Sequence, residues 1–500
     1  MSITLTIADL YDDIRRSLDA LKNDSSAVSQ SRKTLEAELA KGEPIYGVNT
    51  GFGKLANKRI DNEQLSQLQR NLLISHAVGV GNPVPKKITE IMLALKVHSL
   101  GLGYSGVSET TFDRLLHLAT NRLTPVVPSK GSVGASGDLA PLAHMALPLI
   151  GQGYFWGDDD RPRPAAEVLA EEGLKPVELA SKDGLSLING TQFMAAYGAY
   201  ILNRAHKLVR TADILASMSL EALQGSIHPF DSRIHEIRPH QGQQNVAQNV
   251  RTLLQDSEIL ESHRDCGKVQ DPYCLRCVPQ VHGASRDALS HAVDVLEIEM
   301  NSVTDNPLVF PDGEIISGGN FHGQPLALIL DYSAIALAEL ASISERRTYL
   351  LLEGHDGLPR LLMKETGLNS GFMIPQYTAA ALVSENKVLC HPASVDSIPT
   401  SLGQEDHVSM GSISAVKLLQ VLENVQYVFA IELLTAAQAL DYRSPLRPGK
   451  GVEIAHTLIR EKIPHREKDY LFQDDLGPSV KLIKSSTLQK AVESEGCSLV

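Results

Sequence analysis

One stretch constrains the fold of this chain more than any other. Residues 411–440, GSISAVKLLQVLENVQYVFAIELLTAAQAL, run for thirty residues without proline and are rich in Ala, Leu, Glu and Gln. Because these are strong helix formers, the stretch predicts one helix of well above average length. The segment that follows Pro325 has the same character, and residues 190–223 read as one long helix or as two. Long helices of this kind predict a mainly α protein built around a helix bundle.

Glycine-rich segments separate the predicted helices. They occupy residues 46–54, 131–138, 187–192 and 317–323. Loops held on a rigid frame commonly carry functional residues, so these segments are the first candidates for a site. Few stretches predict strands, the clearest being GYFW (153–156) and GEIISGG (313–319). We expect a loop-rich N-terminal part (1–200), a long-helix core (201–440) and a C-terminal helical region (441–500) within one cooperative unit.

Charge and cysteine content narrow the class of partner. The chain has 46 Lys and Arg against 59 Asp and Glu, a net charge of −13, which argues against a nucleic-acid partner. The apolar run after Pro325 contains Asp331 and Glu339, so a buried bundle helix is expected there and no membrane span. Cys274 and Cys277 form a CxxC that lacks a second metal-binding pair, so no metal site is predicted. We expect a cytoplasmic protein whose partners are a small molecule and further copies of the chain.

Two familiar motifs are excluded because residues that they require are absent. In YGVNTGFGK a phosphate-binding loop would need Gly and Ser or Thr where Val48 and Leu55 stand. A nucleophile elbow around Ser136 would need Gly at position 138, which is Asp.

Other polar constellations do not decide a function individually. Gln270, Tyr273 and Arg276 recur three residues apart, so on a helical turn they would combine an amide, a phenol and a guanidinium on one face. A solvated helix face explains that spacing equally well. The acidic residues of GQEDH (403–407) also suit a helix N-terminus, and His76 in an apolar stretch also suits a hydrogen-bonded core residue.

Taken together, the segments resemble the aromatic amino-acid ammonia-lyase family over nearly the whole chain. The most specific element is GSVGASGDLAPLAHMAL, which is similar to the family signature around an Ala-Ser-Gly triplet. The resemblance implies that Ala135, Ser136 and Gly137 close into a 4-methylidene-imidazol-5-one (MIO) ring, so the chain would make its own cofactor. Glycine suits the third position because its amide must approach the Ala135 carbonyl closely. No external cofactor is expected.

The resemblance also implies roles for the other loops. The residues expected to carry catalysis are Tyr46, Ala135, Ser136, Gly137, Tyr273 and Glu405. Those expected to bind substrate or line the ring are His76, Asn189, Gln270, Arg276, Phe321 and Gln404. Arg276 would hold the substrate carboxylate, and either Tyr46 or Tyr273 would move the β-proton.

Two residue pairs favour one substrate within the family. Ser75-His76 and Gln404-Glu405 resemble the members that act on L-histidine. A site built for an imidazole should reject a phenyl ring, because its polar groups would be left unpaired. We therefore predict the conversion of L-histidine to trans-urocanate and ammonia, the first step of histidine degradation. Val278 and His282 depart from the Gln and Met expected in bacterial members, and neither is assigned to the chemistry.

The resemblance implies a fumarase/aspartase-like fold and a homotetramer whose sites draw on more than one chain. Three alternatives stay open. A phenylalanine or tyrosine ammonia-lyase or aminomutase would share the ring, but Ser75-His76 and Glu405 argue against it. A ring-less lyase such as aspartase or fumarase would carry a GSSxMPxKxN loop that the chain lacks. A non-catalytic helical scaffold would have no need of the intact triplet.

Overall fold

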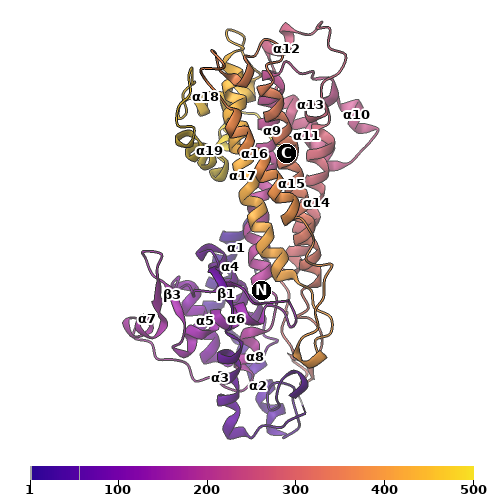
Figure 1. Cartoon of the computed structure of the whole chain (residues 1–500). Coiled ribbons are helices and arrows are strands. Elements are labelled where there is room, and N and C mark those ends of the chain that lie inside the picture. The colour runs from indigo at the N-terminus through magenta and orange to yellow at the C-terminus, as the bar shows by residue number, and fades with distance from the viewer. Residues whose placement is uncertain (1–2, 56) are drawn as a thin grey trace. The chain divides into compact units, whose positions relative to one another are not determined.

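A computed structural model describes residues 3–55 and 57–500, and it confirms a mainly helical protein (Figure 1). The longest helices are α9 (Gln192–Ala222), α14 (Val278–Met300), α15 (Gln324–Leu352) and α17 (Gly411–Asp441). The proline-free stretch 411–440 is therefore one helix, as predicted. Residues 192–222 also form a single helix, without a break.

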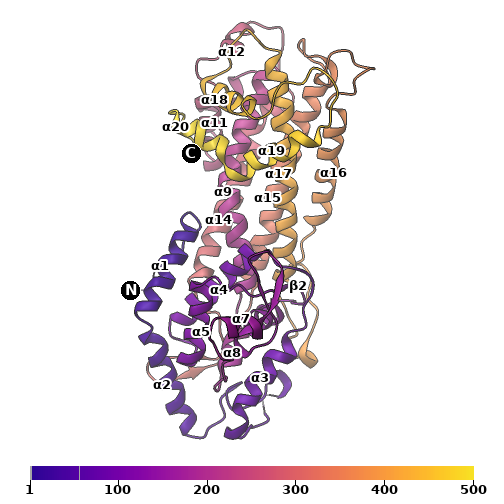
Figure 2. The same ribbon diagram turned by 90° about the vertical axis from the view of Figure 1, so that its left-hand side faces the viewer.

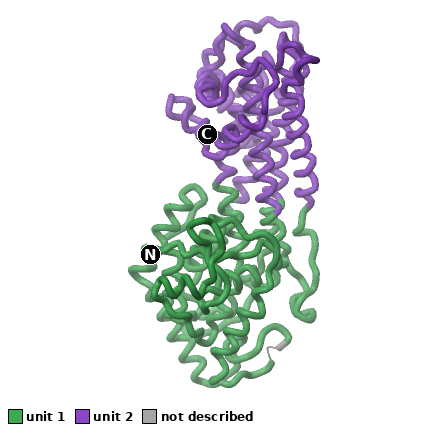
Figure 3. Tube along the Cα trace, turned by 60° about the vertical axis from the view of Figure 1, so that its left-hand side comes forward, with its two compact units in different colours: residues 1–203, 293–331, 392–416 green, residues 204–292, 332–391, 417–500 purple. Residues whose placement is uncertain are grey.

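The described residues form two compact units whose segments alternate along the chain (Figure 3). Unit 1 comprises residues 1–203, 293–331 and 392–416, and unit 2 comprises residues 204–292, 332–391 and 417–500. Each of the four long helices has residues in both units. The expected division at residues 200 and 440 stays a prediction.

Unit 1 contains short helices and three two-stranded antiparallel ribbons, β1–β2, β3–β4 and β5–β6. Its helices are α1 (Leu10–Asn23), α2 (Ser26–Ala40), α3 (Leu65–His76), α4 (Lys86–Gly101), α5 (Glu109–Thr120), α6 (Leu139–Ala146), α7 (Ala165–Glu171) and α8 (Asp183–Ile188), with 3₁₀ turns η1 (Gly53–Leu55), η2 (Asn62–Gln64), η3 (Leu147–Ile150) and η6 (Ser401–Gly403). Its strands are β1 (Val80–Pro83), β2 (Pro128–Lys130), β3 (Tyr154–Trp156), β4 (Pro162–Pro164), β5 (Leu308–Val309) and β6 (Ile315–Ile316). Strands β3 and β6 lie in the two stretches that predicted strands.

The core of unit 1 forms around α4, which is buried on nearly every side from Ile88 to Gly101. Helices α1 and α5 pack against α4, while α3, α6 and α8 pack against one another. Helix α6 carries the apolar run that follows the glycine-rich segment 131–138, and its buried side chains fix that segment on the core. The packing of α6 therefore holds residues 131–138, which contain the candidate triplet, against the core of unit 1.

Unit 2 is dominated by its portions of the long helices, which lie side by side (Figures 1 and 2). Its other helices are α10 (Ser232–Glu236), α11 (Gln241–Leu253), α12 (Glu258–Ser262), α13 (Tyr273–Arg276), α16 (Met373–Leu389), α18 (Lys450–Arg460), α19 (Gln473–Ser485) and α20 (Thr487–Ser494), with 3₁₀ turns η4 (His228–Phe230) and η5 (Arg360–Leu362).

Buried charged pairs tie the long helices of unit 2 together. Arg347 of α15 and Glu432 of α17 are both fully buried, and Arg347 Nε lies 2.5 Å from Glu432 Oε1. The Ser219 hydroxyl of α9 donates to the same carboxylate at 2.7 Å. Arg286 of α14 pairs with Asp213 of α9, with 2.6 Å between Arg286 Nη2 and Asp213 Oδ2. Because removing one partner would leave a buried charge uncompensated, these pairs favour one alignment of the helices.

Among the described residues, α15 alone is long and apolar enough to cross a membrane, judged by length and composition only. Two-thirds of its most apolar window, 67%, is buried inside the protein. The helix thus has the burial of a core helix, as the sequence predicts from Asp331 and Glu339.

Candidate active site

The triplet Ala135-Ser136-Gly137 lies in a tight turn between β2 and α6 in unit 1. Gly137 has a φ of +74°, and a Cβ at this position would collide with the backbone carbonyl of Gly190. Gly134 has a φ of +72°, and a side chain there would collide with Ser409. Only glycine fits both positions, because it alone combines a left-handed backbone with no side chain. Close packing therefore explains the glycine-rich sequence of this turn.

Residues on two other segments hold the turn in place. Gly137 forms a parallel bridge with Gly190, and the Asp138 N–H donates to the Gly190 carbonyl at 2.8 Å. The Met410 N–H donates to the Val133 carbonyl at 2.9 Å. The turn is thus pinned between the loop before α9 and the start of α17.

Asp138, directly after the triplet, is fully buried and acts as a hub. Its Oδ2 accepts the backbone N–H groups of Phe193 and Met194, each at 3.0 Å, at the first turn of α9. Its Oδ1 accepts the Ser412 hydroxyl at 2.8 Å. Burial raises the pKa of Asp138 to about 7, although these hydrogen bonds oppose the rise. The residue following the triplet therefore fixes the relative positions of the turn, α9 and α17 within unit 1.

Ser136 faces Glu405. With Ser136 as an unmodified serine, its hydroxyl donates to Glu405 Oε1 at 3.3 Å. The other carboxylate oxygen, Oε2, accepts the Thr400 hydroxyl at 2.7 Å, and Thr400 and Glu405 also form an antiparallel backbone bridge. The short segment between η6 and α17 thereby aims the carboxylate at the triplet. GQEDH therefore does not begin a helix, since α17 starts only at Gly411.

His76 ends α3 and presents one free ring nitrogen. Its Nδ1 lies 2.8 Å from the Leu72 carbonyl, which can only accept, so Nδ1 carries the proton and Nε2 is left as an acceptor in the neutral ring. Burial lowers the pKa of His76, while the hydrogen bond to Leu72 and the charge of Glu405 oppose that shift. The field of Glu405 therefore acts on both Ser136 and His76.

Tyr46 lies in the glycine-rich loop 46–54. Its phenol oxygen accepts the Gly53 N–H at 3.2 Å. A side chain at Gly53 would collide with Ser401, so this loop lies against the segment that carries Glu405. The structure thus brings Tyr46, Glu405, His76 and the triplet to neighbouring loops of unit 1.

Asn189 is 3% exposed and directs its amide into the protein. The amide donates to the Asn306 carbonyl at 2.8 Å, and the Asn189 backbone carbonyl accepts Lys96 Nζ. Asn189 therefore sits beside the triplet through its neighbour Gly190. Its side-chain amide therefore already donates a hydrogen bond within the protein.

Phe321 and Gln404 are less tightly held. Phe321 is half-buried before α15, two residues ahead of Gly323, whose backbone lies against Met194 and Ser409. Gln404 is exposed, and its backbone N–H donates to the Ser401 carbonyl at 3.2 Å.

The remaining three predicted site residues lie in unit 2. Tyr273 and Arg276 lie on α13, with the guanidinium carbon of Arg276 at 4.7 Å from the centre of the Tyr273 ring. Gln270 precedes the helix, so the expectation of three residues on one helical face is wrong for Gln270. The reason is Pro272, which stands at the N-cap of this short helix. Tyr273 is 70% exposed, whereas Nε of Arg276 is buried and has no hydrogen-bond partner.

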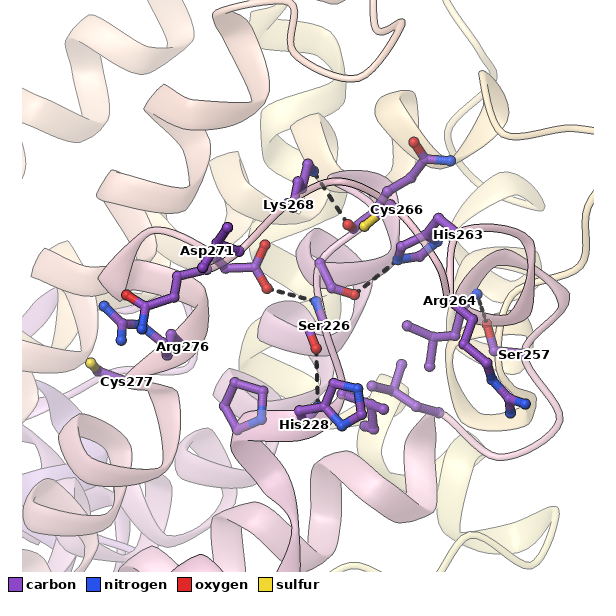
Figure 4. A pocket seen from close by; sticks show the side chains of 18 of the residues that line it. Ser226, His228, Ser257, His263, Arg264, Cys266, Lys268, Asp271, Arg276 and Cys277 are labelled. Atoms are coloured by element: carbon purple, nitrogen blue, oxygen red, sulfur yellow. Dashed lines mark hydrogen bonds between the residues drawn. The ribbon is translucent and has the colours of Figure 1, made fainter.

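Gln270 and Arg276 line a pocket of about 1030 Å³ within unit 2 (Figure 4). Four further cationic or imidazole side chains also line it, Arg264, Lys268, His228 and His263, together with the carboxylate of Glu261. Asp271 lies at the wall and accepts the Ser226 N–H at 2.6 Å. Arg264 and Lys268 already pair with Glu261 and Asp356. The Arg276 guanidinium is therefore the lining cation suited to a substrate carboxylate.

Sequence reasoning missed the residues that support the turn from inside the core. The sequence could have indicated Asp138 as a supporting residue, since it directly follows the triplet. It indicated Lys96 more weakly, as a lysine inside the apolar run IMLALKVHSL. Nothing in the sequence indicated Ser412.

Among the described residues, no group of three or more His, Cys, Asp or Glu could hold a metal ion.

The chain is similar to known proteins over nearly its whole length. A family model described as aromatic amino acid lyase matches residues 5–461. A histidine ammonia-lyase of Sorangium cellulosum is 52% identical, with 98% of each chain covered. The crystal structure of histidine ammonia-lyase from Trypanosoma cruzi is 44% identical, with a TM-score of 0.87 over 94% of this chain and 89% of that one. Tyrosine aminomutase from Streptomyces globisporus is 36% identical, with a TM-score of 0.91 over 99% and 98%.

The chain therefore belongs to the aromatic amino acid lyase family. The resemblance read from the sequence is confirmed, as are the fold of this family and the prediction of a carbon–nitrogen lyase. The family and its structural neighbours are MIO-type enzymes. Among curated proteins, its relatives at about 52% identity bear the name histidine ammonia-lyase.

Proposed function

We propose that this chain is an ammonia-lyase for L-histidine, which it converts to trans-urocanate and ammonia. One observation carries the proposal: the carboxylate of Glu405 lies beside Ser136 of the triplet and within electrostatic reach of His76. The relatives named histidine ammonia-lyase, at 52% and 44% identity over nearly the whole chain, support the same activity.

The residues present fit an MIO ring formed from Ala135, Ser136 and Gly137. The turn already has the left-handed backbone at Gly137, and no side chain fits there. Ala135 is 8% exposed and packs with Val408 and Met410, which leaves little freedom in the turn. Once formed, the ring would supply an electrophile for the substrate amino group, which no ordinary side chain offers.

Glu405 and His76 suit a substrate ring that carries N–H groups. The carboxylate of Glu405 accepts hydrogen bonds, and so does Nε2 of His76 in the neutral ring. A neutral imidazole can donate its one N–H to either acceptor and a protonated imidazole can donate to both, whereas a phenyl ring can donate to neither. Sites of this kind discriminate strongly, because each buried polar group without a partner costs free energy.

Two tyrosines are candidates for moving the β-proton. Tyr46 receives the Gly53 N–H on its oxygen, so its own proton is free for another partner. Tyr273 lies against the Arg276 guanidinium. In this proposal Arg276 binds the substrate carboxylate, and Asn189, Gln270, Phe321 and Gln404 complete the binding site. Orientation by such groups can lower the barrier by up to about 7–11 kcal/mol in ideal cases.

We also propose a homotetramer whose active sites combine residues of different chains. The triplet, Tyr46, His76 and Glu405 belong to unit 1, while Gln270, Tyr273 and Arg276 belong to unit 2. Val269 is 95% exposed and Tyr273 is 70% exposed, as expected for side chains that contact a second chain. The acidic charge and the burial of α15 support a soluble, cytoplasmic enzyme without nucleic-acid or membrane partners.

Shared sites can be tested by complementation. Ser136→Ala and Arg276→Met chains should each be inactive alone. Coexpressed, they should form mixed tetramers in which some sites take an intact triplet from one chain and Arg276 from another, so activity returns. Light scattering gives the oligomeric state. Activity that stays absent in verified mixed tetramers would contradict sharing between chains.

A second candidate is a tyrosine or phenylalanine ammonia-lyase or aminomutase, favoured by the likeness to tyrosine aminomutase. The experiment that separates the two is direct. Purified protein is given L-histidine, L-phenylalanine or L-tyrosine, and the ultraviolet absorbance of urocanate or of the arylacrylate is followed. Histidine should be turned over fastest. Faster turnover of phenylalanine or tyrosine would contradict the proposed substrate.

A further inference from the structure

A lysine lies buried near the triplet, in surroundings where an ammonium group loses the hydration that it has in water. Lys96 of α4 is 1% exposed. Its Nζ donates to the backbone carbonyl of Asn189 and lies 3.5 Å from Gln192 Oε1. A buried ammonium is costly unless it is paired, so its hydrogen-bond partners are the first place to look for a role.

The peptide group that accepts the Lys96 ammonium leads directly to the triplet. The carbonyl of Asn189 and the N–H of Gly190 belong to the same peptide bond. That N–H points at the Ser136 carbonyl, 3.5 Å away. The next carbonyl, of Gly190, accepts the Asp138 N–H at 2.8 Å. Hydrogen bonds in such a chain polarise one another, so a cation at the Asn189 oxygen strengthens the Gly190 N–H as a donor.

We propose that Lys96 is a positioning residue for ring closure, acting through the peptide bond between Asn189 and Gly190 on the Ser136 carbonyl. The inference rests on the proposed MIO function. A stronger hydrogen bond at that carbonyl withdraws electron density from the Ser136–Gly137 amide, so the Gly137 N–H becomes more acidic. It also holds the Ser136 peptide in place while the nitrogen approaches Ala135.

The closure that Lys96 would promote needs no outside reagent. A bond forms between the Gly137 nitrogen and the Ala135 carbonyl carbon. The Ala135 oxygen leaves as water, taking the hydrogens of the Gly137 and Ser136 nitrogens, and a C=N bond remains. A second water takes the Ser136 hydroxyl and the Ser136 Cα hydrogen, which leaves the methylidene. Both steps are dehydrations without a change in overall oxidation state.

Lys96 belongs to a buried cluster of charged groups. Lys182 pairs with Asp305 at 2.6 Å, and the Asn189 amide lies 3.5 Å from the same carboxylate. Asp305 and Asp138 favour the charged form of Lys96, whereas burial and Lys182 oppose it, and burial dominates, lowering the pKa to about 8. Lys182 is equally buried and belongs to the same cluster, but it donates to Asp305 and Ser186. It is therefore a matched control.

Ring closure can be followed by the mass of newly made full-length chain. Cell-free synthesis of the wild type, Lys96→Met, Lys96→Arg and Lys182→Met is sampled over time, and intact mass and ring absorbance are recorded. We expect the wild type to lose two waters and Lys96→Met to lose them about tenfold more slowly or worse, the effect of one charge-assisted hydrogen bond. Lys96→Arg should recover most of the rate, and Lys182→Met should close its ring near the wild-type rate.

Several results would overturn the inference. One is ring closure at the wild-type rate in Lys96→Met. Another is an equal slowing of ring closure in Lys96→Met and Lys182→Met. If Lys96→Met fails to fold by circular dichroism, the pH dependence decides. Wild-type closure should slow above pH 8 as Lys96 loses its charge, while Lys96→Arg should not, and identical profiles would contradict the proposal. A wild-type chain of full encoded mass would instead contradict the proposed function itself.

Discussion

The hydroxyl of Ser136 donates to Glu405 across 269 positions of sequence, at a distance of 3.3 Å. This hydrogen bond joins the residue proposed to lose its hydroxyl to the carboxylate proposed to select the substrate. The Thr400 hydroxyl fixes the second oxygen of Glu405 at 2.7 Å, so the carboxylate has a defined direction.

Replacing Glu405 with Gln should lower kcat/KM for histidine about 10- to 100-fold, because it removes the charge from a hydrogen bond to the substrate. The amide keeps the size of the side chain and can still accept from Thr400. Asp406→Asn is the matched control, since Asp406 is exposed and adjacent. Steady-state urocanate assays measure both. Equal losses in the two variants would contradict a specific role for Glu405.

Gly137→Ala should prevent maturation and destabilise the chain. A left-handed φ costs a residue with a side chain about 1–2 kcal/mol, and the collision with the Gly190 carbonyl adds about 1–3 kcal/mol. Gly173→Ala is the control, because Gly173 has a φ of +69° with open space around it, so only the backbone term applies. Urea unfolding measures the difference. If both variants lost the same stability, the close approach to Gly190 would not matter.

Asp138 should make stability fall as the pH rises from about 4 to about 7. Its pKa is raised to about 7 in the folded protein, above the value of 3.8 expected for the unfolded chain. The folded state therefore holds this proton more tightly, and the resulting stabilisation is complete below pH 4 and lost as the pH rises through 7. Asp138→Asn should lack this component. Tm measured between pH 4.5 and 8 tests it, and parallel curves for both proteins would count against the assignment.

Arg347→Met should destabilise unit 2 by about 3–5 kcal/mol, because it leaves the Glu432 carboxylate buried without its cation. Adding Glu432→Gln should recover much of that loss, since the amide carries no charge and still accepts from Ser219. Arg15→Met is the control, because Arg15 and Asp12 are 71% and 67% exposed and such a pair contributes under about 1 kcal/mol. Denaturant unfolding reports all three, and a loss of that small size in Arg347→Met would disprove the argument.

The long helices could be predicted from the sequence, because helix propensity and the absence of proline depend only on residues close together in the chain. The stretch 411–440 is a helix from Gly411 to Asp441, since nothing in it interrupts helical hydrogen bonding. The expected face of Gln270, Tyr273 and Arg276 failed at Gln270, because Pro272 starts the helix later than the spacing suggests. The position of one proline thus determined where the helix begins, which the regular spacing of the three residues did not indicate.

The interior of the site could not be predicted from the same signals. Lys96 and Asn189 are 93 residues apart, and only tertiary packing brings the ammonium to that carbonyl. The alternation of the two units along the chain has the same origin. Family motifs identified the triplet and its neighbours in the site loops. They did not indicate that the Asn189 amide points inward to the Asn306 carbonyl.

The central claim, that Ala135, Ser136 and Gly137 become the cofactor, is tested most directly by the mass of the intact, purified chain. The wild type should be lighter than its encoded sequence by two waters, and tandem mass spectrometry should place the loss within residues 135–137. Ser136→Ala should lose at most one water and nearly all activity. A wild-type chain of full encoded mass that still converts histidine would contradict the account.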